Sequence, residues 1–140
     1  MQKARIGMHS VEAEADLVHV HWVGLPTLAE LQQIYQQLED YLASGGPGQV
    51  LFDLRAAATP GAELRRYAAS WWRRHADSVI LASYGMSREV ATTIELVARG
   101  VQLVSHKPSY SMNHLTEAEA RAWLAAESRQ RNKSPAELEP

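Results

Sequence analysis

Two histidines stand two residues apart in the segment Asp16–Gly24, which reads DLVHVHWVG. Because alternate residues of a strand point to the same face, His19 and His21 are expected to lie side by side. Two imidazoles could hold a transition metal if His9, in the preceding segment, supplied a third ligand. The alternative is a solvated strand face whose intervening apolar residues point to the core. We favour that alternative and expect neither metal nor cofactor, because two histidines without a nearby carboxylate motif are common by chance.

A second group of polar residues follows two short apolar runs, Gln49–Leu54 and Ser78–Ser83, which are typical of buried parallel strands. In open α/β sheets, ligands bind outside the carboxyl ends of the strands. Ser87 also begins a predicted helix, whose amide groups favour an anion. The alternative is that Ser87 only caps this helix and that Asp53 bonds to backbone groups. The candidate ligand-site residues are Asp53, Arg55, Thr59, Tyr84 and Ser87.

A third group lies on the predicted helix Glu63–His75, where arginines recur along one side. Such a row could bind an acidic partner or a phosphate group, or it could be a solvated helix face. Trp71 fits the apolar stripe, and its neighbour Trp72 points roughly 100° away, so we expect Trp72 to be partly exposed beside the arginines. That composition is typical of an interaction hot spot, although Trp72 could instead cover the sheet edge. The candidate partner-binding residues are Arg65, Arg66, Trp72, Arg73 and Arg74.

Catalytic motifs are missing from the sequence. It holds no G-x-S-x-G, no H-E-x-x-H and no paired carboxylates at an apolar strand end. The absence of cysteine also removes thiolate nucleophiles and cysteine-ligated zinc. We therefore predict no catalytic residues and no enzyme activity. An enzyme remains an alternative only through a metal at His19 and His21.

Length and charge limit the classes of partner. The 140 residues have the usual size of one domain, and the formal net charge of −2 favours neither nucleic acid nor an anionic membrane. No stretch approaches the roughly eighteen apolar residues that a membrane span needs. We expect a cytoplasmic protein that binds neither nucleic acid nor membrane. A homodimer is also compatible with the sequence.

Strand and helix patterns alternate along the chain. Capping boxes at Thr27 and Thr116 begin two of the predicted helices, and Gly45–Gly48 ends the first. The expected fold is α/β, with a mixed, mostly parallel five-stranded sheet, an antiparallel N-terminal hairpin, helices mainly on one face and the order β-β-α-β-α-β-α-β-α. Residues 1–127 would form the domain, and the polar tail 128–140 would be disordered. The expected strands cover residues 5–13, 16–24, 49–54, 78–83 and 110–115, and the expected helices begin at Thr27, Glu63, Ser87 and Thr116.

Several of these segments resemble the STAS superfamily, which includes bacterial anti-sigma-factor antagonists. The resemblance rests on the β-β-α opening, the strands Val50–Leu54 and Val79–Ala82, and the closing segment Thr116–Leu124 (TEAEARAWL). That last segment is similar to a STAS-like branch related to CRAL-TRIO lipid-binding domains. The resemblance implies a non-catalytic regulatory or protein-interaction module in bacterial signalling, or alternatively a domain that binds a small apolar, lipid-like or anionic ligand.

One departure from the family pattern concerns its phosphorylation site. Anti-sigma-factor antagonists carry an Asp-Ser pair after the central strand, and that serine is phosphorylated. Here the segment from Asp53 to Gly61 reads DLRAAATPG and holds no Asp-Ser pair. Thr59 is the nearest hydroxyl residue, and its spacing does not match. The family's phosphorylation switch is therefore not transferred to this chain.

Overall fold

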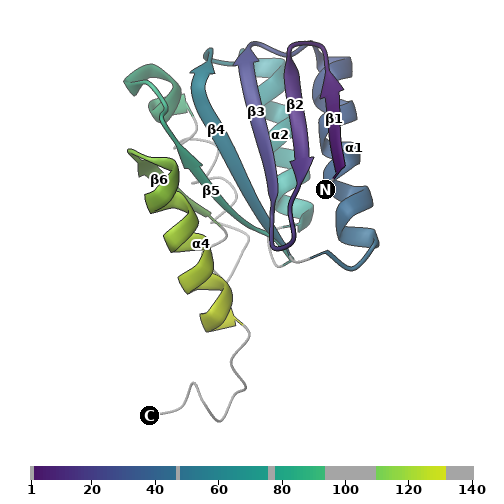
Figure 1. The fold of residues 1–140 in the computed structure, drawn as a ribbon. Helices are drawn as coiled ribbons and strands as arrows, with labels where there is room; N and C mark the ends of the chain where they lie inside the picture. The colour runs from purple at the N-terminus through teal and green to yellow at the C-terminus, as the bar shows by residue number, and fades with distance from the viewer. Residues whose placement is uncertain (1, 47, 76–77, 94–109, 132–140) are drawn as a thin grey trace.

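The computed structural model describes residues 2–46, 48–75, 78–93 and 110–131. Within these residues, six strands form one sheet in the order β1-β2-β3-β4-β5-β6 (Figure 1). The strands are β1 Gln2–Ile6, β2 His9–Ala13, β3 Val18–Gly24, β4 Gln49–Ala57, β5 Ile80–Tyr84 and β6 Tyr110–His114. The long helices are α1 Leu28–Ala43, α2 Ala62–His75 and α4 Glu117–Arg131, and residues 88–93 are also helical.

The sheet is mixed, as the sequence predicts. Strands β1, β2 and β3 pair antiparallel, whereas β3, β4, β5 and β6 pair parallel. The predicted strand count was one too low, because residues 5–13 form parts of two strands rather than one. The chain reverses at Gly7, whose φ of 60° lies in the left-handed region that glycine adopts most readily. The antiparallel part is therefore a three-stranded meander at one side of the sheet.

Helices cover both faces of the sheet, but unequally (Figure 1). The larger core cluster joins α1 and α2 to one face, through residues such as Val20 and Phe52. A smaller cluster joins α4 to the opposite face, through Leu51 and Ala82. Because side chains alternate along a strand, neighbouring residues of β4 enter different clusters. The prediction that helices lie mainly on one face fits α1 and α2, and α4 adds a second, partial layer.

The predicted helix starts agree closely with the structure. Thr27 forms a complete capping box with Glu30, and the hydroxyl of Thr116 accepts a hydrogen bond from the backbone N–H of Glu119. The hydroxyl of Ser87 likewise accepts from the backbone N–H of Val90. Helix α4 continues to Arg131, past the predicted domain boundary. The rest of the predicted third helix beyond residue 93, and tail residues 132–140, lie outside the described residues.

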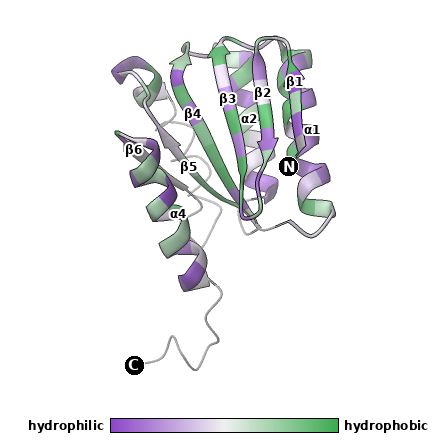
Figure 2. Cartoon of the chain, in the orientation of Figure 1, coloured by the Kyte–Doolittle hydropathy of each residue, from purple (hydrophilic) through white to green (hydrophobic). Residues whose placement is uncertain are grey.

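Helix α4 covers only part of its face of the sheet, and the candidate site lies where the uncovered part meets α4. Helix α4 packs on β4, β5 and β6, so the same face of β1, β2 and β3 has no helix over it among the described residues. Figure 2 shows both hydrophilic and hydrophobic residues on β3, while most of β4 is hydrophobic. None of the described helices is long and apolar enough to cross a membrane.

Candidate functional site

A row of polar side chains crosses the sheet at the level of His21. In the pairing of the parallel strands, His21 lies opposite Asp53, and Asp53 lies opposite Tyr84. His21 Nδ1 is 3.0 Å from Asp53 Oδ2. The three residues share one face, because paired residues on neighbouring strands point the same way. The sequence placed two of them among the ligand-site candidates, and the register brings the third, His21, to the same row.

Arg55 lies beside this row, two residues after Asp53 on β4. Its Nε and Nη2 atoms donate to the two carboxylate oxygens of Asp53 at 3.0 and 2.8 Å, and its backbone N–H donates to Oδ1 at 3.1 Å. The guanidinium also lies 5.6 Å from the centroid of the Tyr84 ring. A two-pronged arginine–carboxylate pair of this kind fixes both side chains in one geometry. Asp53 therefore has its hydrogen-bonding capacity largely occupied by Arg55 and His21.

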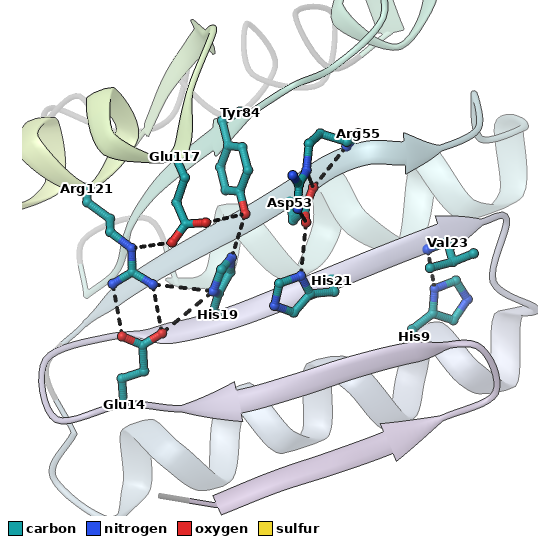
Figure 3. A network of polar contacts seen from close by, with 10 residues as sticks. All are labelled: His9, Glu14, His19, His21, Val23, Asp53, Arg55, Tyr84, Glu117 and Arg121. Atoms are coloured by element: carbon teal, nitrogen blue, oxygen red, sulfur yellow. Dashed lines mark hydrogen bonds and ion pairs between the residues drawn. The ribbon is translucent and has the colours of Figure 1, made fainter.

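A second set of contacts surrounds His19 on the same face. His19 Nε2 is 2.9 Å from the Tyr84 hydroxyl, which in turn donates to Glu117 at 3.2 Å. Arg121 donates to Glu117 at 2.7 Å and to both carboxylate oxygens of Glu14 at 2.9 Å. These contacts connect the turn between β2 and β3 to helix α4. We call the whole set the sheet-face network (Figure 3), which consists of Glu14, His19, His21, Asp53, Arg55, Tyr84, Glu117 and Arg121.

The network sets the protonation of its members. Burial raises the pKa of Asp53, but hydrogen bonds from Arg55 and His21 outweigh it and hold that pKa well below the ordinary range. Burial raises the pKa of Tyr84, and the nearby negative charges of Asp53 and Glu117 raise it further. Burial also lowers the pKa of His19, with a further contribution from His21. At neutral pH the network therefore holds an anionic aspartate, a neutral tyrosine and a neutral histidine.

This arrangement contains only part of what a hydrolytic site needs. A carboxylate that orients an imidazole is one half of a nucleophile–base–acid arrangement. The other half would be a hydroxyl at the remaining ring nitrogen of His21, and no such partner occurs among the described residues. Of the five ligand-site candidates, the structure joins Asp53, Arg55 and Tyr84. No hydrogen bond or ion pair connects Thr59 or Ser87 to them in the described part of the chain.

The metal hypothesis fails at its third ligand. Ser10 of β2 lies opposite His21, so His9, one residue earlier, points to the other face of the sheet. There His9 Nδ1 accepts a hydrogen bond from the backbone N–H of Val23 at 3.0 Å, and its ring contacts Trp22 edge-on. No group of three or more metal-ligating side chains occurs in the described ranges. The disfavoured alternative, in which His9 joins His19 and His21 as a third ligand, is therefore wrong, because of strand alternation.

Acidification is expected to weaken the fold through His9. Its Nδ1 must be unprotonated to accept from Val23, and burial lowers the pKa of His9 more than the nearby Glu30 raises it. Because the folded-state pKa lies below the unfolded value of about 6.5, this stabilisation is complete above that pH and is lost as the pH falls through the folded-state pKa. Urea unfolding midpoints measured from pH 8 to pH 5 should fall. The fall should be smaller in His9→Gln, and an equal fall in both proteins would contradict this role.

The exposure expected for Trp72 is also wrong. Its side chain is only 7% exposed, and its indole N–H donates to the Tyr35 hydroxyl at 3.1 Å. The ring also contacts Phe52 and Trp71 edge-on. Because α1 packs beside α2, it buries residues of α2 that lie outside the apolar stripe of that helix. Trp72 is a core residue.

The arginines of α2 differ among themselves. Arg66, Arg73 and Arg74 are exposed, as expected for a solvated or partner-binding row. Arg65 is half-buried, and its guanidinium donates to the backbone oxygen of Pro60. Of the five predicted partner-binding residues, Trp72 is buried and Arg65 is half-buried. The other three are exposed arginines along the helix.

Three members of the sheet-face network could not be identified from sequence patterns. Glu117 and Arg121 have the i, i+4 spacing of a helical ion pair, which is a common feature of solvated helices. Glu14 lies 107 residues from its partner Arg121, so no local spacing connects them. Their role depends on how α4 packs across the sheet.

Comparison with known proteins supports the fold alone. No protein-family model matches the chain, and no curated protein matches it. Among solved structures, a variant of RsbS from Moorella thermoacetica is similar, with a TM-score of 0.58 and 16% sequence identity. The match covers 85% of this chain and 96% of that one. RsbS is a STAS-domain anti-sigma-factor antagonist. The chain described here therefore has the STAS-like fold that its sequence predicts.

Proposed function

We propose that this chain is a non-catalytic protein-interaction module of STAS type that acts in bacterial signalling in the cytoplasm. The observation that carries this proposal is the internal pairing of the sheet-face network. Asp53 is bound by Arg55 and His21, and Glu14 is bound by Arg121. A general base or acid works best when its pKa lies near the operating pH, and the pKa values of Asp53 and Tyr84 are shifted away from it. Paired charges of this kind make a rigid, structured surface rather than a reactive one.

Exposed apolar side chains favour one edge of the molecule for partner binding. The large hydrophobic side chains that stand exposed in the described ranges are Met8, Leu25 and Leu115, at 68%, 50% and 82%. All three lie where the parallel strands end: Leu25 follows β3, Leu115 follows β6, and Met8 lies in the turn that leads into β2. We call these three residues the strand-end edge. Single exposed apolar residues are ordinary, but their restriction to one edge supports a contact surface there.

Basic side chains at or near this edge suggest the charge of the partner. Arg55 extends from the end of β4 with 66% of its side chain exposed, and Arg66 is exposed in the first half of α2. Arginine beside apolar residues is the composition of interface centres. We therefore expect a partner that presents apolar side chains together with carboxylates. Arg73 and Arg74, at the far end of α2, form a separate candidate surface.

The double variant Leu25→Ser/Leu115→Ser is expected to weaken partner binding at least tenfold, because interface affinity is concentrated in a few apolar and arginine contacts. Partners captured by the wild-type chain from native lysate would be identified by quantitative mass spectrometry. One partner would then be purified, and calorimetry would measure its dissociation constant with the wild-type chain and with the Leu25→Ser/Leu115→Ser variant. A second double variant, Arg73→Ala/Arg74→Ala, tests the far end of α2.

A matched control is Asp16→Ser, which changes an exposed residue in the turn between β2 and β3, at the opposite edge. It should leave the dissociation constant unchanged. Equal binding by wild type and the Leu25/Leu115 variant would contradict the strand-end edge as the contact surface. If the captured partner is the chain itself, sedimentation of the same variants would show the shift from dimer to monomer.

A further inference from the structure

A cavity of about 130 Å³ lies between the sheet and the helices α1 and α2. Its walls come from β3, β4, β5, α1, α2 and the helical residues 88–93. They are almost wholly apolar and rich in aromatic rings. The main lining residues are Trp22, Tyr35, Phe52, Leu64, Trp72 and Val90.

Two polar atoms in this apolar wall have no hydrogen-bond partner in the described part of the chain. They are the indole Nε1 of Trp22 and the hydroxyl of Ser83, and both residues line the cavity. Trp22 is 7% exposed and Ser83 is 1% exposed. Leaving a buried donor or acceptor without a partner costs folding free energy. The other two tryptophans of this core avoid that cost, because Trp71 donates to Glu39 and Trp72 donates to Tyr35.

The size of the cavity limits what it can hold. A water molecule occupies about 30 Å³ of liquid, and a dry apolar cavity of about 150 Å³ accepts benzene. A volume of about 130 Å³ therefore suits one six-membered ring or a chain of similar bulk. The edges and faces of Trp22, Phe52 and Trp72 provide the contacts that an aromatic ring prefers.

The charge of the lining residues limits the charge of the molecule that the cavity can hold. Arg65 is the one charged side chain among the described lining residues, and its guanidinium donates to the backbone oxygen of Pro60. No carboxylate or lysine lines the cavity in the described ranges. A cation would lose its hydration without meeting a counter-charge among the described lining residues. Arg65 is half-buried and already bonded to Pro60, so an uncharged occupant is favoured.

We propose that this cavity is a binding site for a small uncharged aromatic molecule that carries one hydroxyl group, that is, a phenol-like ligand. The ring lies among Trp22, Phe52 and Trp72, and the hydroxyl of the ligand bonds to the Ser83 hydroxyl and accepts a hydrogen bond from Trp22 Nε1. The ligand enters past Leu25 and Pro60, which belong to the lining at the end of the sheet where β3 and β4 terminate. This site is separate from the sheet-face network, which lies on the opposite face.

Phenol itself is the probe for the test. Titration into ¹⁵N-labelled wild-type protein is expected to give saturable shifts of the Trp22 indole resonance, assigned with Trp22→Phe, that exceed those of Trp71. Ser83→Ala should weaken phenol binding at least threefold while leaving the fold intact. Ala68→Met, which places a larger side chain in the lining, should weaken it at least tenfold. The matched control Ala69→Met changes the next residue of α2, which is not among the described lining residues, and should bind phenol as wild type does.

Comparison of phenol with toluene shows which molecule the cavity prefers and whether the hydroxyl contributes to binding. Toluene has the same ring bulk without the hydroxyl. It should bind wild type more weakly than phenol does, and it should bind Ser83→Ala as tightly as it binds wild type. Toluene binding as tightly as phenol to wild type would overturn the hydrogen-bonding part of the proposal. Absence of saturable shifts, or equal phenol affinity in Ala68→Met and wild type, would overturn the site altogether and leave water as the occupant. Thermal unfolding of each variant shows whether its core is intact, and Ser83→Ala keeps the test valid if Ala68→Met does not fold.

Discussion

Replacing Trp72 with alanine is expected to lower the free energy of unfolding by about 3–5 kcal/mol. The indole is 7% exposed and belongs to the larger core cluster, where it contacts Phe52 and Trp71. Its removal deletes these contacts, enlarges the adjacent cavity and leaves the buried Tyr35 hydroxyl without its donor. Each of these changes destabilises the folded state.

Chemical denaturation followed by circular dichroism measures this loss. Arg73→Ala is the control, because it changes the neighbouring, exposed residue and should stay within about 0.5 kcal/mol of wild type. Trp72→Phe should fall between the two, since it keeps part of the ring contacts and loses the hydrogen bond. If Trp72→Ala cost less than 1 kcal/mol while abolishing partner binding, Trp72 would be an interface residue after all.

Asp53→Asn is expected to be the most damaging single change in the sheet-face network, with a loss of about 1–3 kcal/mol at pH 7. The substitution keeps the shape of the side chain and removes its charge. Arg55 and His21 then lose the anionic acceptor that both contact, and the half-buried His21 ring loses its fixed orientation. The change leaves both core clusters untouched, so the loss comes from electrostatics and hydrogen bonding rather than from packing.

The pH dependence of this loss identifies its cause. The pKa of Asp53 is lower in the folded protein than the usual value of about 4, so its stabilisation is present above that pH and is lost as the pH falls through the folded-state pKa. The difference in unfolding free energy between wild type and Asp53→Asn should therefore shrink below about pH 4. Asp16→Asn, at an exposed turn, serves as the control with no expected effect. A difference that stays constant from pH 7 to pH 3 would mean that the charge of Asp53 plays no part.

Local patterns account for most of the elements. The capping box at Thr27, the glycines after Ala43 and the apolar run that begins at Gln49 each specify a boundary by nearest-neighbour chemistry, and the structure places those boundaries within a few residues. The exception is the segment before Ala13. Its weak alternation is compatible with one strand or two, and only the reversal at Gly7 distinguishes them.

The site could be predicted only in part. Asp53, Arg55 and Tyr84 follow from the rule that strand ends collect functional side chains, because that rule depends on topology alone. His9 and Trp72 were misplaced for a different reason. The face that His9 occupies depends on the register between β2 and β3, and the burial of Trp72 depends on α1 lying beside α2.

The sequence by itself determined the order of strands and helices that follow Ala13 in the described residues, because periodicity and capping are properties of neighbouring residues. It also determined that His19 and His21 share a face, since that requires only the alternation of a strand. Tertiary structure alone decided which groups those histidines meet. The Tyr84 contact of His19 spans 65 residues, and the Arg121 contact of Glu14 spans 107. Partners that far apart along the chain are selected by strand register and helix packing, which no local spacing encodes.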